Sequence, residues 1–406
     1  MNCKKRKGNH KFGFGGMMEM IYIAKDIPLW QVTIWDKKFN NVDKKWQPKT
    51  IKYKYLLSDE LDSLRVDDGD VRILYTGKDV GFTTEELAGD RLSEGEIISI
   101  PWGGIPTVKY HKGKFVTGDN RIATSKDINK LTNKYLYYFM RGNIHEIASY
   151  YRGASLKHPC MKDILKMTIS YPSVQEQDKI CGQFDVLEQI IEVRKQELQL
   201  LDDLIKARFV EMFNLSDCIY KSLGECTDFV DYRGHTPELS DEGIIRMVNA
   251  KSVGKGFFKY VDEFVTEETY DAWMHRGFGY PGDILFVTEG HTFGNTCLIP
   301  EDMTKFALGQ RVITIKGKEE IKNAFLCSYM QTDMFWKDIN VYRTGGTAQG
   351  IRSKDLVKVM VPIPPIEQQI EFVRFVHKFD KSKVAVQKAL DETQMLFDSL
   401  MQKYFG

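Results

Sequence analysis

The chain has 406 residues, of which 42% are hydrophobic, so it is long enough to bury two or more cores. No apolar run approaches the ~20 residues that span a bilayer, which argues against a membrane-spanning protein and against a membrane partner. The net charge of +1 gives no overall attraction to a polyanion, so nucleic-acid binding would require local basic patches.

The first predicted elements lie in residues 21–172. Residues 1–20 before them are basic and rich in glycine, and we expect a disordered leader there. The alternation over Trp30–Trp35 predicts a strand, Val71–Tyr75 and Ile97–Ile100 are short β-rich runs, and Thr132–Met140 has the pattern of a helix. This mixture predicts an α+β domain of ordinary size.

The second half of this domain is locally basic. Residues 101–170 contain twelve Lys and Arg against four Asp and Glu, a local charge of +8 in a nearly neutral chain. Lys and Arg contacts with phosphates dominate non-specific affinity for DNA, so the patch fits a nucleic-acid surface. The alternative is an ordinary solvated face.

Residues 173–215 follow as one predicted long helix. Its apolar residues recur at the a and d positions of a heptad, which is typical of a coiled coil. The series is interrupted by charge at Arg194 and Arg208. Its members are Ile180, Phe184, Leu187, Ile191, Leu198, Leu201, Ile205 and Met212.

The chain then repeats itself. Residues 216–362 predict a second mixed domain, and residues 363–406 predict a second long helix whose heptads match the first at an offset of 192. The sequence Pro-Ser-Val-Gln-Glu-Gln at 172–177 is answered by Pro-Pro-Ile-Glu-Gln-Gln at 364–369. A period this long indicates a duplicated half-molecule, because solenoid periods run to roughly 20 to 50 residues.

The two motifs, each before a long helix, resemble those of the specificity subunit of type I restriction-modification systems. The runs Ile98–Gly104, Gly118–Thr124 and Gly282–Val287 also resemble its target-recognition domains. The resemblance covers nearly all of residues 21–405. It implies an α+β fold with two similar mixed α/β target-recognition domains, separated by two long helices that pack as an antiparallel coiled coil with an internal pseudo-twofold repeat.

The resemblance also implies a function. Each target-recognition domain would read one half of a two-part site on double-stranded DNA, and the helices would set the gap and dock the modification (methyltransferase) subunits, two in number. The assembly would recruit the restriction (translocase and nuclease) subunits in the cytoplasm. The chain itself would be a non-catalytic subunit, with the endonuclease and adenine methyltransferase activities on its partners.

No cofactor is expected in this chain, because its histidines and seven cysteines show no metal-ligand spacing. The cysteines are expected to be reduced thiols, as is usual in the cytoplasm. S-adenosylmethionine, ATP and Mg are expected on the partner subunits.

Side-chain chemistry suggests which residues contact DNA, since Lys binds phosphates while Arg, Asn and Gln reach base edges. In the first domain Lys109, Lys112 and Lys114 are candidate phosphate contacts and Asn120 and Arg121 candidate readers, with Trp102 or Tyr110 as apolar contacts. The candidates in the second domain are Tyr232, Arg233, His235, His291, Gln310, Arg311, Arg343, Gln349 and Arg352. The alternative for each is a surface or hinge residue.

The sequence leaves two alternative functions. Asp283 with Glu289 and His291 faintly resembles the carboxylate pair of a Mg-dependent nuclease, but the usual lysine is missing and Asp283 fits a turn before a strand better. The other alternative is a coiled-coil scaffold without DNA recognition, and the paired basic recognition lobes argue against it.

Overall fold

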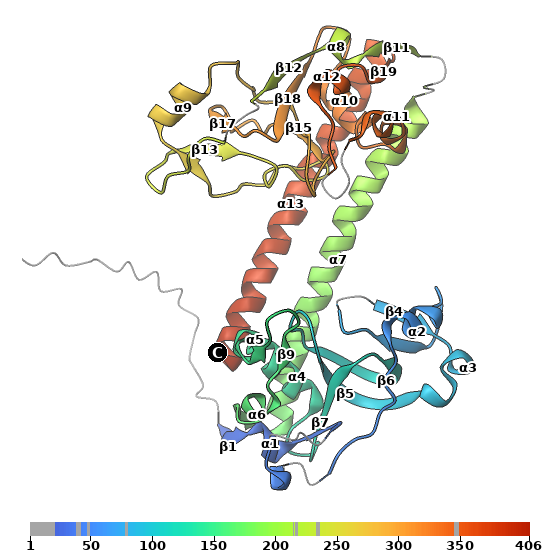
Figure 1. Ribbon diagram of the computed structural model, residues 1–406, viewed down its shortest axis with the longest axis vertical. Coiled ribbons are helices and arrows are strands. Elements are labelled where there is room, and N and C mark those ends of the chain that lie inside the picture. The colour runs from blue at the N-terminus through green and yellow to red at the C-terminus, as the bar shows by residue number, and fades with distance from the viewer. Residues whose placement is uncertain are drawn as a thin grey trace, which may run out of the picture. The chain divides into compact units, whose positions relative to one another are not determined.

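The computed structural model describes residues 21–37, 42–46, 49–77, 80–213, 215, 218–232, 236–344 and 349–406 (Figure 1). The leader expected at residues 1–20 lies outside these residues. The chain divides into two compact units, Met1–Glu192 with Asp391–Gly406, and Val193–Leu390. Each unit therefore contains one mixed domain and a part of each long helix.

The mixed domain of unit 1 contains short helices around a six-stranded sheet. Its elements are β1 (Tyr22–Pro28), α1 (Leu29–Val32), β2 (Thr33–Trp35), η1 (Lys44–Trp46), α2 (Ser58–Ser63), β3 (Val71–Leu74), β4 (Val80–Thr83), α3 (Glu85–Ala88), η2 (Gly89–Arg91), β5 (Ser93–Pro101), β6 (Lys109–Thr117), β7 (Asn120–Ser125), α4 (Asn133–Gly142), α5 (Ile144–Ser149), β8 (Tyr151–Arg152), β9 (His158–Pro159), α6 (Met161–Ile164) and β10 (Thr168–Pro172).

The sheet has the order β2-β7-β5-β6-β3-β4, and its pairs are antiparallel except β3 with β6. Its core includes Ile98, Phe115 and Ile122, all fully buried. The predicted runs at 71–75 and 97–100 are strands, and the predicted helix at 132–140 is α4. The strand predicted over Trp30–Trp35 is wrong in its first half, because α1 is fixed there by backbone hydrogen bonds from residues 29 and 30 to residues 167 and 165.

The mixed domain of unit 2 is built in the same manner. Its elements are β11 (Ile219–Ser222), α8 (Leu223–Cys226), β12 (Thr227–Asp231), β13 (Ile245–Val248), β14 (Phe264–Val265), α9 (Glu267–Trp273), β15 (Ile284–Val287), β16 (Thr296–Leu298), β17 (Phe306–Leu308), β18 (Val312–Gly317), α10 (Asn323–Tyr329), α11 (Asp333–Tyr342), α12 (Ser353–Leu356) and β19 (Met360–Ile363).

The sheets of unit 2 repeat the strand register of unit 1. The main sheet has the order β12-β18-β15-β16, beside a three-stranded sheet β14-β13-β17. In β5 and β7 Ile98 lies opposite Ala123, and in β15 and β18 Ile284 lies opposite Ile315. The first strand of each pair is displaced by 186 residues and the second by 192, so the connection between the two strands is six residues longer in unit 2.

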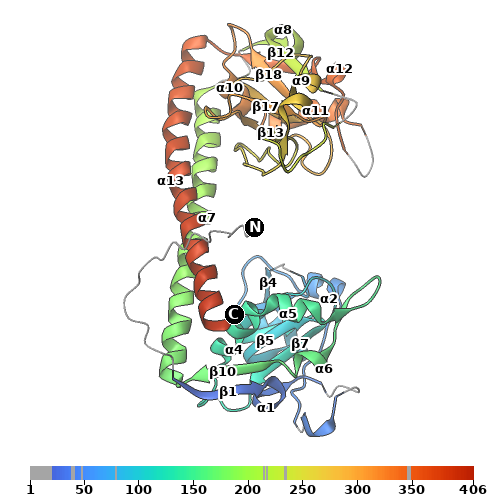
Figure 2. The same ribbon diagram turned by 90° about the vertical axis from the view of Figure 1, so that its left-hand side faces the viewer.

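The two long helices are α7 (Val174–Met212) and α13 (Ile366–Phe405), which lie within the ranges predicted for them. In unit 1 the ring of Phe184 contacts those of Phe397 and Phe405. In unit 2 residue 202 pairs with residue 383 and residue 208 with residue 371, so the helices run antiparallel there (Figure 2). The seam prediction is confirmed, since all the predicted a and d positions of both helices are buried or half-buried.

The seam shifts by one residue near the end of α7. Phe209 and Phe213 are buried although neither falls on the predicted heptads, and both rings pack against Phe325 of α10 and Phe372 of α13. In a straight α-helix, positions seven residues apart do not lie directly above one another. The buried face therefore rotates slowly around the helix and includes different positions at its end. Here the buried face packs against the core of unit 2.

A buried glutamine joins each long helix to its own mixed domain. Gln177 accepts a hydrogen bond from the backbone N–H of Thr132 (2.9 Å) and donates to the carbonyls of Lys130 (2.7 Å) and Pro172 (2.9 Å). The equivalent Gln369 accepts from residue 322 (2.8 Å) and donates to residues 320 (3.0 Å) and 364 (2.8 Å). Both side chains are fully buried, so the amide group closes three hydrogen bonds in each unit.

Candidate nucleic-acid interface

The predicted phosphate contacts of unit 1 lie along β6. Lys112 is mostly exposed, with its ammonium 4.0 Å from the Glu96 carboxylate. Lys114 pairs with Glu85, and Lys109 donates to backbone carbonyls at residues 75 and 77. Each lysine therefore has a partner inside the domain, which weakens the local field that the charge count alone implies.

Tyr110 lies on the same strand and donates a hydrogen bond to Glu96 (2.7 Å). Burial, together with this carboxylate, raises the pKa of the Tyr110 hydroxyl well above its ordinary value. The phenol therefore stays protonated and bound to Glu96 at neutral pH. Its ring also lies 5.7 Å from that of Tyr137 in α4, so Tyr110 is tied to the domain rather than standing free as an apolar contact.

The structure corrects the expectation that Asn120 and Arg121 reach base edges. Both are buried, with exposed fractions of 1% for Asn120 and 2% for Arg121. The Asn120 amide donates to the carbonyl of Leu74 (2.9 Å) and to the hydroxyl of Thr117 (3.2 Å). A side chain that is buried and hydrogen-bonded in this way shapes the loop between β6 and β7. It does not face solvent, where DNA would bind.

Arg121 lies at the centre of a buried charge cluster. Its guanidinium is 3.4 Å from the Asp36 carboxylate, pairs also with Asp119, and lies 4.7 Å from the centroid of the Trp102 ring. Burial raises the pKa of Asp36 to about 6, against the opposing effect of Arg121. Tyr55 donates to the same carboxylate. The cluster joins β2, β7 and the loop after β5.

Trp102 is half-buried at the end of β5. Its ring lies 5.2 Å from that of His158, whose Nδ1 is 2.6 Å from the Trp102 carbonyl. The tryptophan is thus held between Arg121 and His158, and it fixes the start of the exposed segment that follows.

The candidates of unit 2 divide into three groups. Tyr232 is fully buried and donates to the carbonyl of Gly277 (2.7 Å), which corrects the prediction that it faces DNA. Arg233 and His235 lie outside the described residues. The remaining candidates are exposed or half-buried: His291, Gln310, Arg311, Arg343, Gln349 and Arg352.

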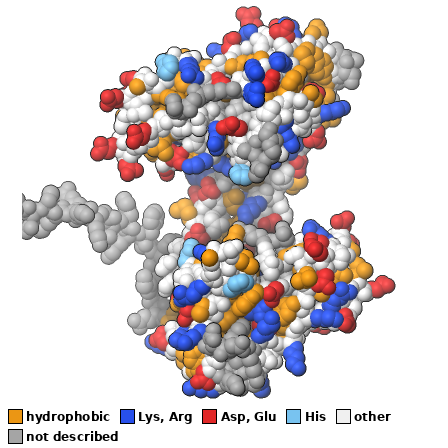
Figure 3. All heavy atoms as spheres, viewed as in Figure 1, with side chains coloured by type: hydrophobic (Ala, Val, Ile, Leu, Met, Phe, Trp, Pro, Cys, Tyr) orange, Lys and Arg blue, Asp and Glu red, His pale blue; other side chains and the backbone are white. Residues whose placement is uncertain are grey.

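The structure brings three of these candidates together after β15. The Arg311 Nε donates to Glu289 (3.0 Å), and the carbonyl of Gln349 accepts a hydrogen bond from the N–H of Gly290 (3.0 Å), next to His291. Arg343, by contrast, donates to Asn340 (3.2 Å) at the end of α11, and Arg352 precedes α12. Figure 3 shows Lys and Arg interspersed with Asp and Glu on the visible face of each unit, without one large basic field.

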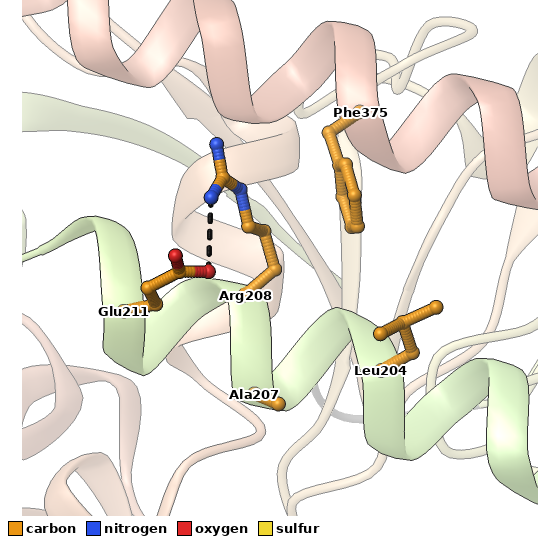
Figure 4. A pocket seen from close by; sticks show the side chains of 5 residues that line it. All are labelled: Leu204, Ala207, Arg208, Glu211 and Phe375. Atoms are coloured by element: carbon orange, nitrogen blue, oxygen red, sulfur yellow. Dashed lines mark hydrogen bonds and ion pairs between the residues drawn. The ribbon is translucent and has the colours of Figure 1, made fainter.

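The helix pair of unit 2 carries a pocket of ≈ 540 Å³, lined by Leu204, Ala207, Arg208, Glu211 and Phe375 (Figure 4). Arg208, which interrupts the heptads, bonds to Glu211 (2.9 Å) in α7 and to Glu371 (3.3 Å) in α13. Its guanidinium is 5.7 Å from the centroid of the Phe375 ring. The charge therefore spans the two helices at the surface of the seam.

The geometry at Asp283 does not favour a nuclease. Asp283 accepts hydrogen bonds from the N–H of Tyr280 (3.0 Å) and from Asn323 (3.3 Å), as a turn residue before β15 would. Among the described residues no group of three or more His, Cys, Asp or Glu could hold a metal ion. In the same part of the chain no helix is both long and apolar enough to cross a membrane.

Sequence comparison identifies relatives along most of the chain. The model of the type I restriction modification DNA specificity domain matches residues 62–202 and 229–393. The type I restriction enzyme EcoDI specificity subunit of Escherichia coli is 22% identical over 340 residues, which cover 74% of each chain. The EcoR124I/EcoR124II specificity subunit, also of Escherichia coli, is 25% identical over 280 residues, 64% of this chain and 66% of the relative.

A solved structure has the same fold. The crystal structure of the type I restriction-modification S subunit from M. genitalium aligns with a TM-score of 0.59 at 17% identity, covering 97% of this chain and 98% of that one. The family model matches both mixed domains and more than half of the chain. This protein therefore belongs to the type I restriction-modification DNA specificity family, as a specificity subunit that recognises DNA sequence.

Proposed function

We propose that each mixed domain reads one half of a two-part site on double-stranded DNA, and that the helices α7 and α13 set the gap between the halves. The observation that carries this proposal is the repeat of one strand register, Ile98 opposite Ala123 and Ile284 opposite Ile315, under loops of different sequence. One scaffold with two sets of loops suits two different half-sites. At 39 residues, α7 is about 58 Å long, against ~34 Å for one turn of DNA.

The exposed cations and polar groups are the proposed DNA contacts. In unit 1 Lys112 would bind a phosphate. In unit 2 Arg311, His291 and Gln349 come from loops that meet after β15, and would face bases. A lysine that binds phosphate lowers affinity for all sequences alike when it is removed, whereas a base contact alters the preference at one position.

The helices are the proposed docking surface for the modification subunits, two for each specificity subunit. Both helices expose apolar residues to solvent, among them Val186 and Val193 in α7 and Val384 in α13. Exposed apolar side chains on a helix pair suit a protein partner. The methyltransferase and endonuclease activities, with S-adenosylmethionine, ATP and Mg, would belong to the modification and restriction subunits, in a cytoplasmic complex in which this chain carries no cofactor.

Selection of duplexes from a random library by the chain assembled with its modification subunits tests this function. We expect a two-part motif with a fixed unspecified gap. Exchange of residues 21–172 for the equivalent domain of a relative should change one half of the motif and leave the other half unchanged. A single contiguous motif, or changes in both halves, would contradict independent readers, and no enrichment at all would favour the scaffold function.

A further inference from the structure

Each of the two mixed domains contains the same contact between two of its own loops. In unit 1 the N–H of Gly104 donates to the carbonyl of Lys157 (3.3 Å), and in unit 2 the N–H of Gly290 donates to that of Gln349 (3.0 Å). These glycines have φ of 92° and 100°, a region that favours glycine. The glycines are 186 residues apart in the sequence and the two residues that accept from them are 192 apart. These are the same offsets as those of the paired strands. We call the two loops, residues 102–105 with 153–158 and residues 288–291 with 349–350, the loop joint of each unit.

The rest of the joint repeats as well. The N–H of Trp102 donates to the carbonyl of Asp119, and the N–H of Thr288 donates to that of Arg311, both at 2.9 Å. In unit 2 the carbonyl of Thr288 accepts from the N–H of residue 351 (2.9 Å). The equivalent residue of unit 1 is a proline without an N–H, and there the ring of His158 lies against the Trp102 carbonyl instead. The equivalent carbonyl is thus bonded by a backbone N–H in unit 2 and by a histidine side chain in unit 1.

The side chains on the joint differ in chemistry between the units. In unit 1 Ile105 is 76% exposed and Leu156 is 55% exposed. A Cβ at Gly103 would lie 3.1 Å from the Leu156 side chain, so the two loops approach closely at this point. In unit 2 the joint carries Glu289 and the exposed His291, and Glu289 is paired with Arg311 from the neighbouring loop. A preserved backbone with unlike exposed side chains is the arrangement expected of a surface that reads two different sequences.

We propose that the loop joint is the base-reading element of each domain, and that in unit 1 Ile105 and Leu156 contact thymine methyl groups in the major groove. The inference rests on the proposed function. The thymine methyl is the apolar feature that base pairs present in that groove. Lys157, exposed on the same loop in a segment with a local charge of +8, supplies the complementary charge for the phosphates. The proposal therefore predicts an A·T pair in the half-site of unit 1. It predicts no equivalent thymine contact for the half-site of unit 2.

The test uses the chain with its modification subunits and the double variant Ile105→Ala/Leu156→Ala. We expect weaker preference at one or two positions of one half-site, an unchanged second half, and roughly ten-fold lower affinity, the size of one lost base-pair contact. His291→Ala should alter the other half. The variant Leu87→Ala/Ile128→Ala removes exposed apolar groups elsewhere on unit 1 and should leave the motif unchanged.

A second measurement separates reading from folding. Replacing thymine by deoxyuracil in the first half-site should weaken binding of the wild type and leave the double variant unaffected. An unchanged motif with affinity within about two-fold for Ile105→Ala/Leu156→Ala, or a wild type indifferent to deoxyuracil, would overturn the inference. If the wild type itself selects no two-part motif, the proposed function fails first.

Discussion

At the scale of single residues, the Asp36 carboxylate should make the stability of unit 1 depend on pH. Its pKa is raised by burial from an ordinary 3.8 to about 6, so the folded state binds the proton more tightly than the unfolded state. This contribution is complete below the unfolded pKa and is lost as the pH rises through the folded pKa. Relative to Asp36→Asn, the wild type should lose on the order of 3 kcal/mol of unfolding free energy between about pH 4 and pH 7.

Urea unfolding at a series of pH values measures this difference. Asp67→Asn, which neutralises an exposed carboxylate of the same domain, is the matched control. The groups that face Asp36 are Arg121, Lys37 and the hydroxyl of Tyr55, and all of them are kept in both variants. A difference between wild type and Asp36→Asn that stays constant with pH would contradict the predicted effect.

The same cluster shows why residue roles could not be predicted from the sequence. Arg121 has the chemistry of a base reader, but its acidic partner Asp36 lies 85 positions earlier and only the fold brings them together. Asn120 likewise bonds to a carbonyl 46 residues away. Residue type gives the chemistry that a side chain can perform. Burial depends on long-range packing, which a local pattern does not contain.

At the scale of elements, the buried glutamines should fix each long helix to its domain. Gln177→Ala leaves the N–H of Thr132 and two carbonyls without their partner in a buried site, and we expect a loss of about 2 to 4 kcal/mol in the unfolding free energy of unit 1. Gln369→Ala should do the same to unit 2. The exposed neighbours Gln175→Ala and Gln368→Ala are matched controls and should change stability by less than about 0.5 kcal/mol.

Chemical denaturation, followed by a probe in each unit, distinguishes these variants. A loss at Gln177→Ala no larger than that at Gln175→Ala would show that the hydrogen bonds are replaced by water.

The sequence contained both glutamines in its repeated motif, and the heptads predicted both helices, because these patterns are local. The bonds of Gln177 to residues 130 and 132 were not predictable, since they connect elements about 45 positions apart. The shift of the seam to Phe209 and Phe213 depends on the same kind of distant packing, here against α10.

At the scale of the whole molecule, the length of the helix pair should set the gap between the two half-sites. The boundary between the units falls at residues 192 and 193 of α7 and residues 390 and 391 of α13. Whole heptads inserted at both places keep the seam in register. Three heptads in each helix add about 31 Å, or roughly nine base pairs, so the second half-site returns to nearly the same face of the duplex.

We therefore expect the variant with three added heptads to select the same two half-sites with a gap about nine base pairs longer. One added heptad lengthens the pair by about 10 Å, or three base pairs, which turns the second half-site by roughly 100° around the DNA and should weaken binding. Library selection with both variants separates the effect of helix length from the effect of rotating the second half-site around the DNA. If the gap stays constant while the helices lengthen, the spacing is set by the partner subunits. If the half-sites themselves change, the units do not read DNA independently of the helices that join them.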